Sequence, residues 1–445
     1  MTEKSTLAKF LPAYFHLTKI GGVISSIIPR PITGLFSQKV QISLPVLKAG
    51  AAYFGIMKEG MEGKRKVVIH PFNFPPEILH AMGLAPVFIE YLSTIAAFAP
   101  KKFPDNVFKY LDYSHETGLP GTLCAGQLGG AGALLYGDLP KPDAILSGAP
   151  GFCDVNSKIL EYTARTLDVP LLHVDMSAYN DQRALDYFRL SFRDVINQLE
   201  DVTGHKLDEA SLREAVENSN RVIELYNEIS GLQTAVPSPI PNYYTSLNLG
   251  MKFAVTGLHE AIPVYEAVLK TAKKKFKKGE GALRSEKARC LMLYTSIYFD
   301  DGPFVIESSF NQWLEEMGIS IIMDILSYFP LTPIDTTSMD TMIDGLAEAA
   351  LNYPMARQMK GPSDDPAGWA EDMVFLAKKY KADCCIFSGN PACKRAHGSL
   401  RLLTDRLKNE LGIPTLNLEA DSWDRRISPM PEIQEKITDF MEAIA

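Results

Sequence analysis

Several features are scarce or missing in this sequence of 445 residues, and each absence excludes a class of protein. Six cysteines are too few for the disulfide scaffold of a small secreted protein, and two of them are adjacent. Residues 1–9 are polar and charged, and no apolar stretch with a small-residue cleavage site follows them, as a secretory signal requires. We therefore expect a cytoplasmic protein in a reducing compartment, whose cysteines are available as thiolates.

Positive charge and long apolar runs are also lacking. The chain has 45 lysines and arginines against 53 acidic residues, which argues against a general nucleic-acid binder. The most apolar stretch, residues 20–56, is interrupted by charged residues and prolines, so no transmembrane segment is expected. It is predicted to be an amphipathic segment that packs on the body or on a partner; a membrane-surface anchor is the alternative.

Common catalytic motifs are absent too. Residues 60–65 lack the spacing of a phosphate-binding loop, and residues 130–135 miss the third glycine of a dinucleotide fingerprint. The eight histidines show no His-Glu-x-x-His spacing, and no Gly-x-Ser-x-Gly elbow is present. ATP hydrolysis by this chain and serine-hydrolase chemistry therefore have no support.

The remaining pattern is that of a soluble α/β protein with two to three domains. Short apolar runs that alternate with helical periods indicate two Rossmann- or flavodoxin-like halves with parallel sheets. We predict an N-terminal helical extension over residues 1–65, a first α/β domain over 66–200, a helical connecting segment over 201–285 and a second α/β domain over 286–445. The strands are expected at residues 67–70, 86–89, 143–146, 170–174, 290–294, 319–323, 383–387 and 415–418.

An internal repeat relates the two halves. Residues 143–153 read DAILSGAPGFC, and residues 383–393 read DCCIFSGNPAC. Both copies contain an apparent strand, then Ser-Gly-x-Pro, then a cysteine ten positions after the aspartate. Each is followed by a predicted helix, a Val-Pro or Ile-Pro pair and another buried strand. The matched context indicates a structural duplication.

Three cysteines stand where an α/β protein collects its ligands. Cys153 and Cys393 follow strands, and Cys124 precedes a glycine-rich run over residues 126–132 whose small residues are expected to admit a bulky ligand. A structural zinc site wants four ligands and usually tight Cys-x-x-Cys pairs, which are missing. Three thiolates suit a [4Fe-4S] cluster with one iron left open, although such clusters usually take four. The alternative is that all three are small buried hydrophobes.

Longer motifs resemble the 2-hydroxyacyl-CoA dehydratase and benzoyl-CoA reductase family. Residues 75–86, PPEILHAMGLAP, are similar to the family's Pro-Glu-Glu-Leu-x-x-Ala-Ala-Gly-x-x-Pro. Residues 380–421 resemble its Tyr-x-Ala-Asp-Gly segment, cysteine loop and Gly-x-Pro, and residues 421–426, DSWDRR, resemble Asp-x-x-Asp-x-Arg. The resemblance covers roughly residues 66–445, is weakest in the helical middle, and in length is closest to the larger benzoyl-CoA reductase type of subunit.

The resemblance implies a cofactor, partners and a reaction. It implies that Cys124, Cys153 and Cys393 ligate a [4Fe-4S] cluster with one non-cysteine position. It further implies a related second subunit, or a second copy, and a separate ATP-hydrolysing iron–sulfur activator that supplies an electron. The substrate would be an acyl-CoA, and the reaction either 2-hydroxyacyl-CoA dehydration through a ketyl radical or reduction of an aromatic acyl-CoA. The residues that transfer protons are not identified by the resemblance.

Several features leave alternatives open. Some dehydratases carry small hydroxyl residues where this chain has residues 70–74, HPFNF, which argues against dehydratase-type handling of the 2-hydroxyl group. Asn73 and Glu90 are polar candidates, but a loop or strand-end role is favoured for both. Cys290, Cys384 and Cys385 are expected to pack in the core. A homodimeric reductase with a double cluster, and a scaffold without any cluster, are the competing functions. The lysines of residues 270–278 favour a helix end over a CoA-phosphate site.

Overall fold

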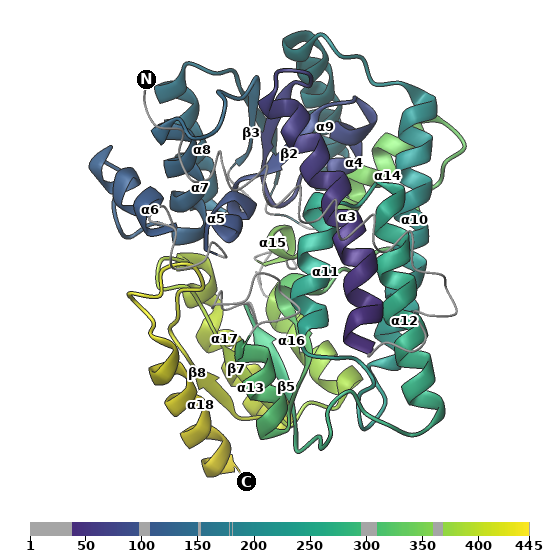
Figure 1. The fold of residues 1–445 in the computed structure, drawn as a ribbon, viewed down its shortest axis with the longest axis vertical. Helices are drawn as coiled ribbons and strands as arrows, with labels where there is room; N and C mark the ends of the chain where they lie inside the picture. The colour runs from purple at the N-terminus through teal and green to yellow at the C-terminus, as the bar shows by residue number, and fades with distance from the viewer. Residues whose placement is uncertain are drawn as a thin grey trace.

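Two sheets of four parallel strands lie at the centres of the two halves of the chain (Figure 1). The computed structural model describes residues 38–97, 107–149, 153–177, 179, 181–294, 309–358 and 368–444. The first sheet has the order β2-β1-β3-β4, and the second has the order β6-β5-β7-β8. The strands are β1 Val67–His70, β2 Ala85–Phe88, β3 Ala144–Ala149, β4 Leu171–Asp175, β5 Ala288–Leu293, β6 Ile319–Asp324, β7 Cys384–Phe387 and β8 Thr415–Asn417.

The two sheets repeat one topology, because the strands of each half pair in the order second, first, third, fourth. The same hydrogen bonds recur at the repeated aspartates. In the first half, the N–H of Val67 donates to the Asp143 carboxylate at 2.8 Å, and the Asp143 N–H donates to the Val67 carbonyl. In the second half, Arg289 and Asp383 make the same two contacts. The predicted α/β fold with duplicated halves is confirmed.

Helices cover both faces of each sheet, as parallel strands buried on both faces require. Strands β1, β2, β5, β6 and β7 are buried along their whole length. The helices of the first half are α4 Pro76–Ala81, α5 Ile89–Ala97, α6 Val107–Glu116, α7 Ala125–Tyr136, α8 Asp154–Leu167 and α9 Gln182–Thr203. Those of the second half are α13 Ser309–Met317, α14 Met339–Leu351, α15 Pro354–Arg357, α16 Gly368–Tyr380, α17 Lys394–Leu411 and α18 Met430–Ile444, with the short η3 Ile325–Ser327.

A helical layer lies beside both halves (Figure 1). It contains α3 Gln38–Met61, α10 Glu209–Leu232, α11 Tyr243–Ala254, η1 His259–Ala261 and α12 Ile262–Lys277. Helix α12 packs against both α10 and α3, which places the described part of the N-terminal extension in this layer. Residues 1–37 of that extension lie outside the described residues, and the domain boundaries remain predictions. No helix within the described ranges is long and apolar enough to cross a membrane.

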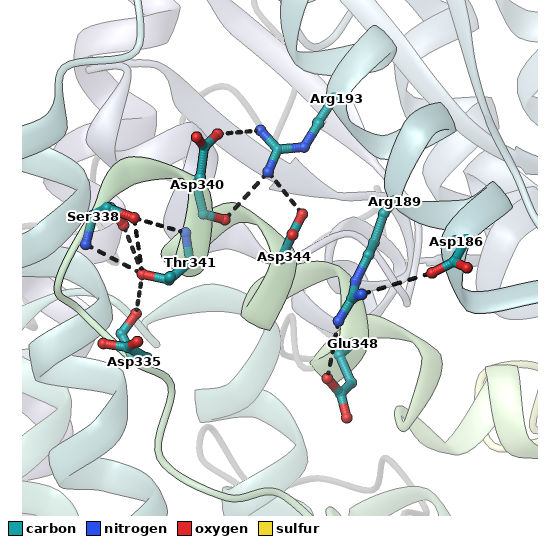
Figure 2. A network of polar contacts seen from close by, with 9 residues as sticks. All are labelled: Asp186, Arg189, Arg193, Asp335, Ser338, Asp340, Thr341, Asp344 and Glu348. Atoms are coloured by element: carbon teal, nitrogen blue, oxygen red, sulfur yellow. Dashed lines mark hydrogen bonds and ion pairs between the residues drawn. The ribbon is translucent and has the colours of Figure 1, made fainter. Parts of the chain in front are cut away.

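Helix α14 follows the first two strands of the second sheet in the chain but packs against α9 and α10 beside the first half. Met342 and Leu346 of α14 share a buried apolar cluster with Phe188 and Phe192 of α9. Figure 2 shows the polar rim of this contact, where Arg193 pairs with Asp340 and Asp344, and Arg189 with Glu348 and Asp186. The crossing of α14 therefore joins the two halves through an apolar core with an ionic edge.

The glycine-rich run over residues 126–132 has a different role from the one expected. It lies inside helix α7, where a Cβ on Gly130 would come within 2.2 Å of the Ile89 carbonyl oxygen. A Cβ on Gly132 would come within 2.0 Å of the Tyr110 carbonyl oxygen. The expectation of close approach to a ligand is wrong for these positions, because their small size lets α5 and α6 pack directly against α7.

Candidate functional site

The three predicted cysteines occupy the same local position in three different helices. Cys124 is the N-cap residue of α7, Cys153 of α8 and Cys393 of α17, so each helix begins directly after a thiol. Cys153 and Cys393 stand beyond the third strand of their sheets, as the repeat predicts. Helix N-termini carry partial positive charge, which favours the thiolate form of a nearby cysteine. The backbone N–H groups of Asn156 and Ala396, each three residues after its cysteine, lower the pKa of Cys153 and Cys393, although burial dominates at both thiols.

The thiols of Cys124, Cys153 and Cys393 lie close enough to influence one another's pKa, so they belong to one site. Burial, then Cys393, and also Glu90 raise the pKa of Cys153 to about 12. The pKa of Cys124 is raised by burial and then by Asp421, Cys153 and Cys393. Three thiolates would therefore repel one another in a buried place. Such a site is stable with its thiols protonated, or with a cationic group bound among them.

The other cysteines pack as expected. Cys290 of β5 pairs in register with Cys384 of β7, and Leu291 pairs with Cys385. All three cysteine side chains are fully buried in apolar clusters. The core role predicted for Cys290, Cys384 and Cys385 is confirmed.

Glu90 and Gln127 form a buried polar pair beside Cys153. The Gln127 side-chain amide donates to Glu90 Oε1 at 3.0 Å and lies 3.7 Å from the Cys153 thiol. Glu90 Oε2 and Gln127 Oε1 are buried and have no hydrogen-bond partner in the structure. Burial raises the pKa of Glu90 to about 8. The sequence favours a loop or strand-end role for Glu90; the residue does come shortly after β2, but it lies in the first turn of α5 with its side chain buried near the Cys153 thiol.

Two further residues at the site are not identified by the sequence patterns. Tyr294 directly follows β5 with a φ of 101°, a left-handed conformation that an aromatic residue rarely adopts. Its hydroxyl contacts the Cys393 thiol, and this contact lowers the pKa of Cys393, although burial dominates and raises it. The side-chain amide of Gln358, just after α15, also contacts the Cys393 thiol and lowers its pKa. Strained backbone and orphaned polar atoms are typical of functional sites.

The remaining candidates are Asn73 and the lysine run. Asn73 is in the turn after β1, buried, with neither side-chain amide atom hydrogen-bonded in the structure. The lysine run ends helix α12, as predicted, and Lys273 pairs with Glu228. Among the described residues, no group of three or more His, Cys, Asp or Glu side chains is arranged to hold a single metal ion. A mononuclear metal site therefore has no support there.

Comparison with known proteins gives one consistent result. Residues 71–444 match the family described as 2-hydroxyglutaryl-CoA dehydratase, D-component. The chain is 24% identical to the (R)-phenyllactyl-CoA dehydratase alpha subunit of Clostridium sporogenes, over 83% of this chain and 87% of that protein. It is 20% identical to the (R)-2-hydroxyisocaproyl-CoA dehydratase alpha subunit of Clostridioides difficile, over 83% and 88%. It is also 20% identical to the (R)-2-hydroxyglutaryl-CoA dehydratase alpha subunit of Acidaminococcus fermentans, over 69% and 61%.

Proposed function

The chain belongs to the 2-hydroxyglutaryl-CoA dehydratase D-component family, and on this premise we propose that it is a [4Fe-4S]-binding subunit of an enzyme that dehydrates a 2-hydroxyacyl-CoA. The relatives are named for three different 2-hydroxyacyl-CoA substrates, which supports the reaction class and leaves the acyl group open. The observation that carries the proposal is the meeting of Cys124, Cys153 and Cys393 at the starts of three helices.

The donor set fits such a cluster. Thiolates are the usual protein ligands of iron–sulfur clusters, commonly one to each iron, so three cysteines would leave one iron of a cube without a cysteine ligand. Burial and their mutual proximity disfavour the thiolate forms of these cysteines, and a bound cationic group such as an iron–sulfur core would offset that cost. We assign Cys124, Cys153 and Cys393 as the residues that would hold it. When bound, such a cluster supplies a single electron at low potential to the thioester substrate.

The surrounding residues prepare a dry site for that chemistry. Cys124, Cys393, Glu90 and Gln127 are each at most 8% exposed and Cys153 is half-buried, so bulk water has little access to most of the site. Because burial raises the pKa of Glu90 to about 8, this carboxyl group carries a proton at neutral pH. Gln127 holds Glu90 Oε1, and the other carboxyl oxygen has no partner in the structure. We propose that Glu90 holds a proton at Oε2 for the departing hydroxyl group.

The partners follow from the same assignment. The matched relatives are named as alpha subunits, which supports a complex with another subunit. We propose a homologous second subunit, or a second copy, together with an ATP-hydrolysing iron–sulfur activator. This chain has no phosphate-binding loop of its own, so ATP hydrolysis is assigned to the activator.

A reaction assay separates the proposal from its competitors. The anaerobically purified complex is incubated with activator, ATP, reductant and a panel of 2-hydroxyacyl-CoA and aromatic acyl-CoA thioesters. Loss of one water from a 2-hydroxyacyl-CoA, detected by mass spectrometry, is the expected result. Reduction of an aromatic ring without dehydration would support the reductase function, and no turnover by an iron-free protein would support a scaffold.

A further inference from the structure

The chain after β8 runs beside the loop that carries Cys393. The Leu418 N–H donates to the Phe387 carbonyl at 2.7 Å, and the Ala420 N–H donates to the Gly389 carbonyl at 3.1 Å. These contacts place the next six residues, 421–426, beside the end of the Cys393 loop, where α17 begins. Residues 421–426 are called the tie segment below.

Asp421 is the centre of this arrangement. Its carboxylate is 3% exposed; Oδ2 accepts from the Asn390 side-chain amide at 2.7 Å. Its Oδ1 accepts from the backbone N–H groups of Trp423 at 2.8 Å and Asp424 at 2.9 Å. A buried carboxylate that accepts three hydrogen bonds stabilises a turn. Removing it leaves three buried donors without an acceptor, which lowers the stability of the turn.

Asn390 connects Asp421 to the backbone of Cys393 through hydrogen bonds. Its Oδ1 accepts from the Ala392 N–H at 2.8 Å, which fixes which end of the amide faces Asp421. Its backbone carbonyl accepts from the Cys393 N–H at 2.8 Å and lies 3.1 Å from His397 Nε2. The position of the Cys393 backbone therefore depends on a residue that Asp421 holds.

The other end of the tie segment reaches the first half of the molecule. The Trp423 ring lies over Gly126, two residues after Cys124, where an added Cβ would be 2.9 Å from the indole carbons. Trp423 Nε1 donates to Thr94 Oγ1 of α5 at 3.2 Å.

Two arginines continue the contact. Arg425 donates to the Ala97 carbonyl at 3.3 Å, and Arg426 pairs with Asp112 of α6 at 2.8 Å. In Figure 1 the yellow-green loops that precede α18 lie just below α6. The tie segment thus contacts α5, α6 and α7, while its first residue is bonded to the Cys393 loop.

We propose that the tie segment fixes the Cys393 loop of the second half against the Cys124 helix of the first, and that Asp421 is its positioning residue. Asp421 also lies near Cys124, because among charged groups it raises the pKa of Cys124 the most, after the larger effect of burial. This proximity supports the placement. The consequence for cluster binding rests on the proposed function; the consequence for the backbone of the two loops does not.

A swap of the two side chains tests the proposal directly. In Asp421→Asn, an amide NH₂ faces the Asn390 NH₂; in Asn390→Asp, two carboxylate oxygens face each other. In the double variant, the new amide at position 421 donates to the new carboxylate at position 390, while both turn contacts keep an oxygen acceptor. The single variants should be disordered at the cysteine loops and the double variant largely restored, which is a coupling that unrelated defects do not produce.

The primary measurement is amide hydrogen exchange on the full-length protein without iron. In each single variant, we expect exchange at least ten-fold faster over residues 389–394 and in the first turn of α7, and recovery in the double variant. Asp138→Asn is the matched control, since the Asp138 side chain is 6% exposed, lies just beyond the far end of α7 and is bonded to Tyr110 and Lys109. It should leave both loops unchanged. Unchanged exchange in Asp421→Asn, or purely additive effects in the double variant, would overturn the proposal.

Iron content after anaerobic reconstitution with Fe²⁺ and sulfide is the second measurement. Asp421→Asn should bind less than half the iron of the unmodified chain, and the double variant should recover it. If the unmodified chain binds no iron, the cluster assignment fails while the exchange result still decides the role of Asp421. If every variant binds iron equally, Asp421 does not position the ligands.

Discussion

Gln127 donates its side-chain amide to Glu90 across 3.0 Å, and the same nitrogen lies 3.7 Å from the thiol of Cys153. The two residues lie in the first turns of neighbouring helices, α7 and α5, whose close approach depends on the glycines of α7. The packing of α5 against α7 therefore also determines where the Glu90 carboxyl group lies relative to the thiols. A change that separates α5 from α7 also separates the carboxyl group from the thiols.

Replacing Glu90 by glutamine should make stability less dependent on pH. The ordinary carboxyl pKa is 4.5, whereas burial raises the pKa of Glu90 to about 8. The folded state thus holds a proton that the unfolded state releases, and this group's stabilisation is lost as pH rises from about 4.5 to about 8. Glu90→Gln should gain stability relative to the unmodified protein across that window. Urea unfolding of the iron-free protein at several pH values measures this; a difference that is constant from pH 5 to pH 9 would contradict the assignment.

Replacing Cys393 by alanine should abolish most iron binding if the proposed assignment holds, because it removes one of the three proposed cysteine ligands. Cys384→Ala is the matched control, since that thiol is fully buried in the core of the second sheet. Both variants are expected to lose thermal stability through the missing sulfur, but only Cys393→Ala should lose iron. Equal iron content in the two variants would show that Cys393 is a packing residue.

The glycines of α7 provide a prediction about the fold. Gly130→Ala places a methyl group 2.2 Å from the Ile89 carbonyl oxygen, so α5 must move, at a cost of about 3 kcal/mol in the free energy of unfolding. Gly231→Ala, in helix α10 with no atom within 4 Å of the new methyl group, should instead stabilise by about 0.5 to 1 kcal/mol. Chemical denaturation of both variants checks the opposite signs. A small effect of Gly130→Ala would mean that α5 and α7 are not tightly packed.

Substitutions at the contact between α14 and α9 test whether apolar packing or ion pairs contribute more to joining the two halves. Met342→Ala removes a fully buried side chain and should cost about 3 kcal/mol. Arg193→Met breaks the partly exposed ion pairs with Asp340 and Asp344 and should cost less than about 1 kcal/mol, falling further at high salt. The free energies of unfolding at low and high salt distinguish the two effects. A larger loss from Arg193→Met than from Met342→Ala would show that the ionic edge, and not the apolar core, joins the halves.

The fold could be predicted well because its signals are local. The apolar runs around Val67 and Ile319 mark buried strands, and the repeated Asp143 and Asp383 identify the duplication and its identical strand order. The three cysteines could be selected because each follows a loop at the carboxyl end of a sheet or opens a helix. These patterns need only a short stretch of sequence to be visible.

The polar residues of the site could not be predicted in the same way. Tyr294 reaches Cys393 from another strand of the second sheet, with a backbone conformation that its residue type disfavours. Glu90 resembles an ordinary strand-end residue until α7 places Gln127 beside it. The role of the glycine-rich run could not be predicted from the sequence, because a small residue allows a ligand or a neighbouring helix to approach equally well. The contacts with Ile89 and Tyr110 show that neighbouring helices occupy this space.

The most direct test of the central claim is the iron and acid-labile sulfide content of the anaerobically purified chain, measured with its electron paramagnetic resonance spectrum. Three cysteine ligands and one open position predict about four irons and four sulfides per chain. About eight irons would indicate the double-cluster alternative. A chain that folds but binds neither iron nor sulfide, with or without reconstitution, would contradict the account.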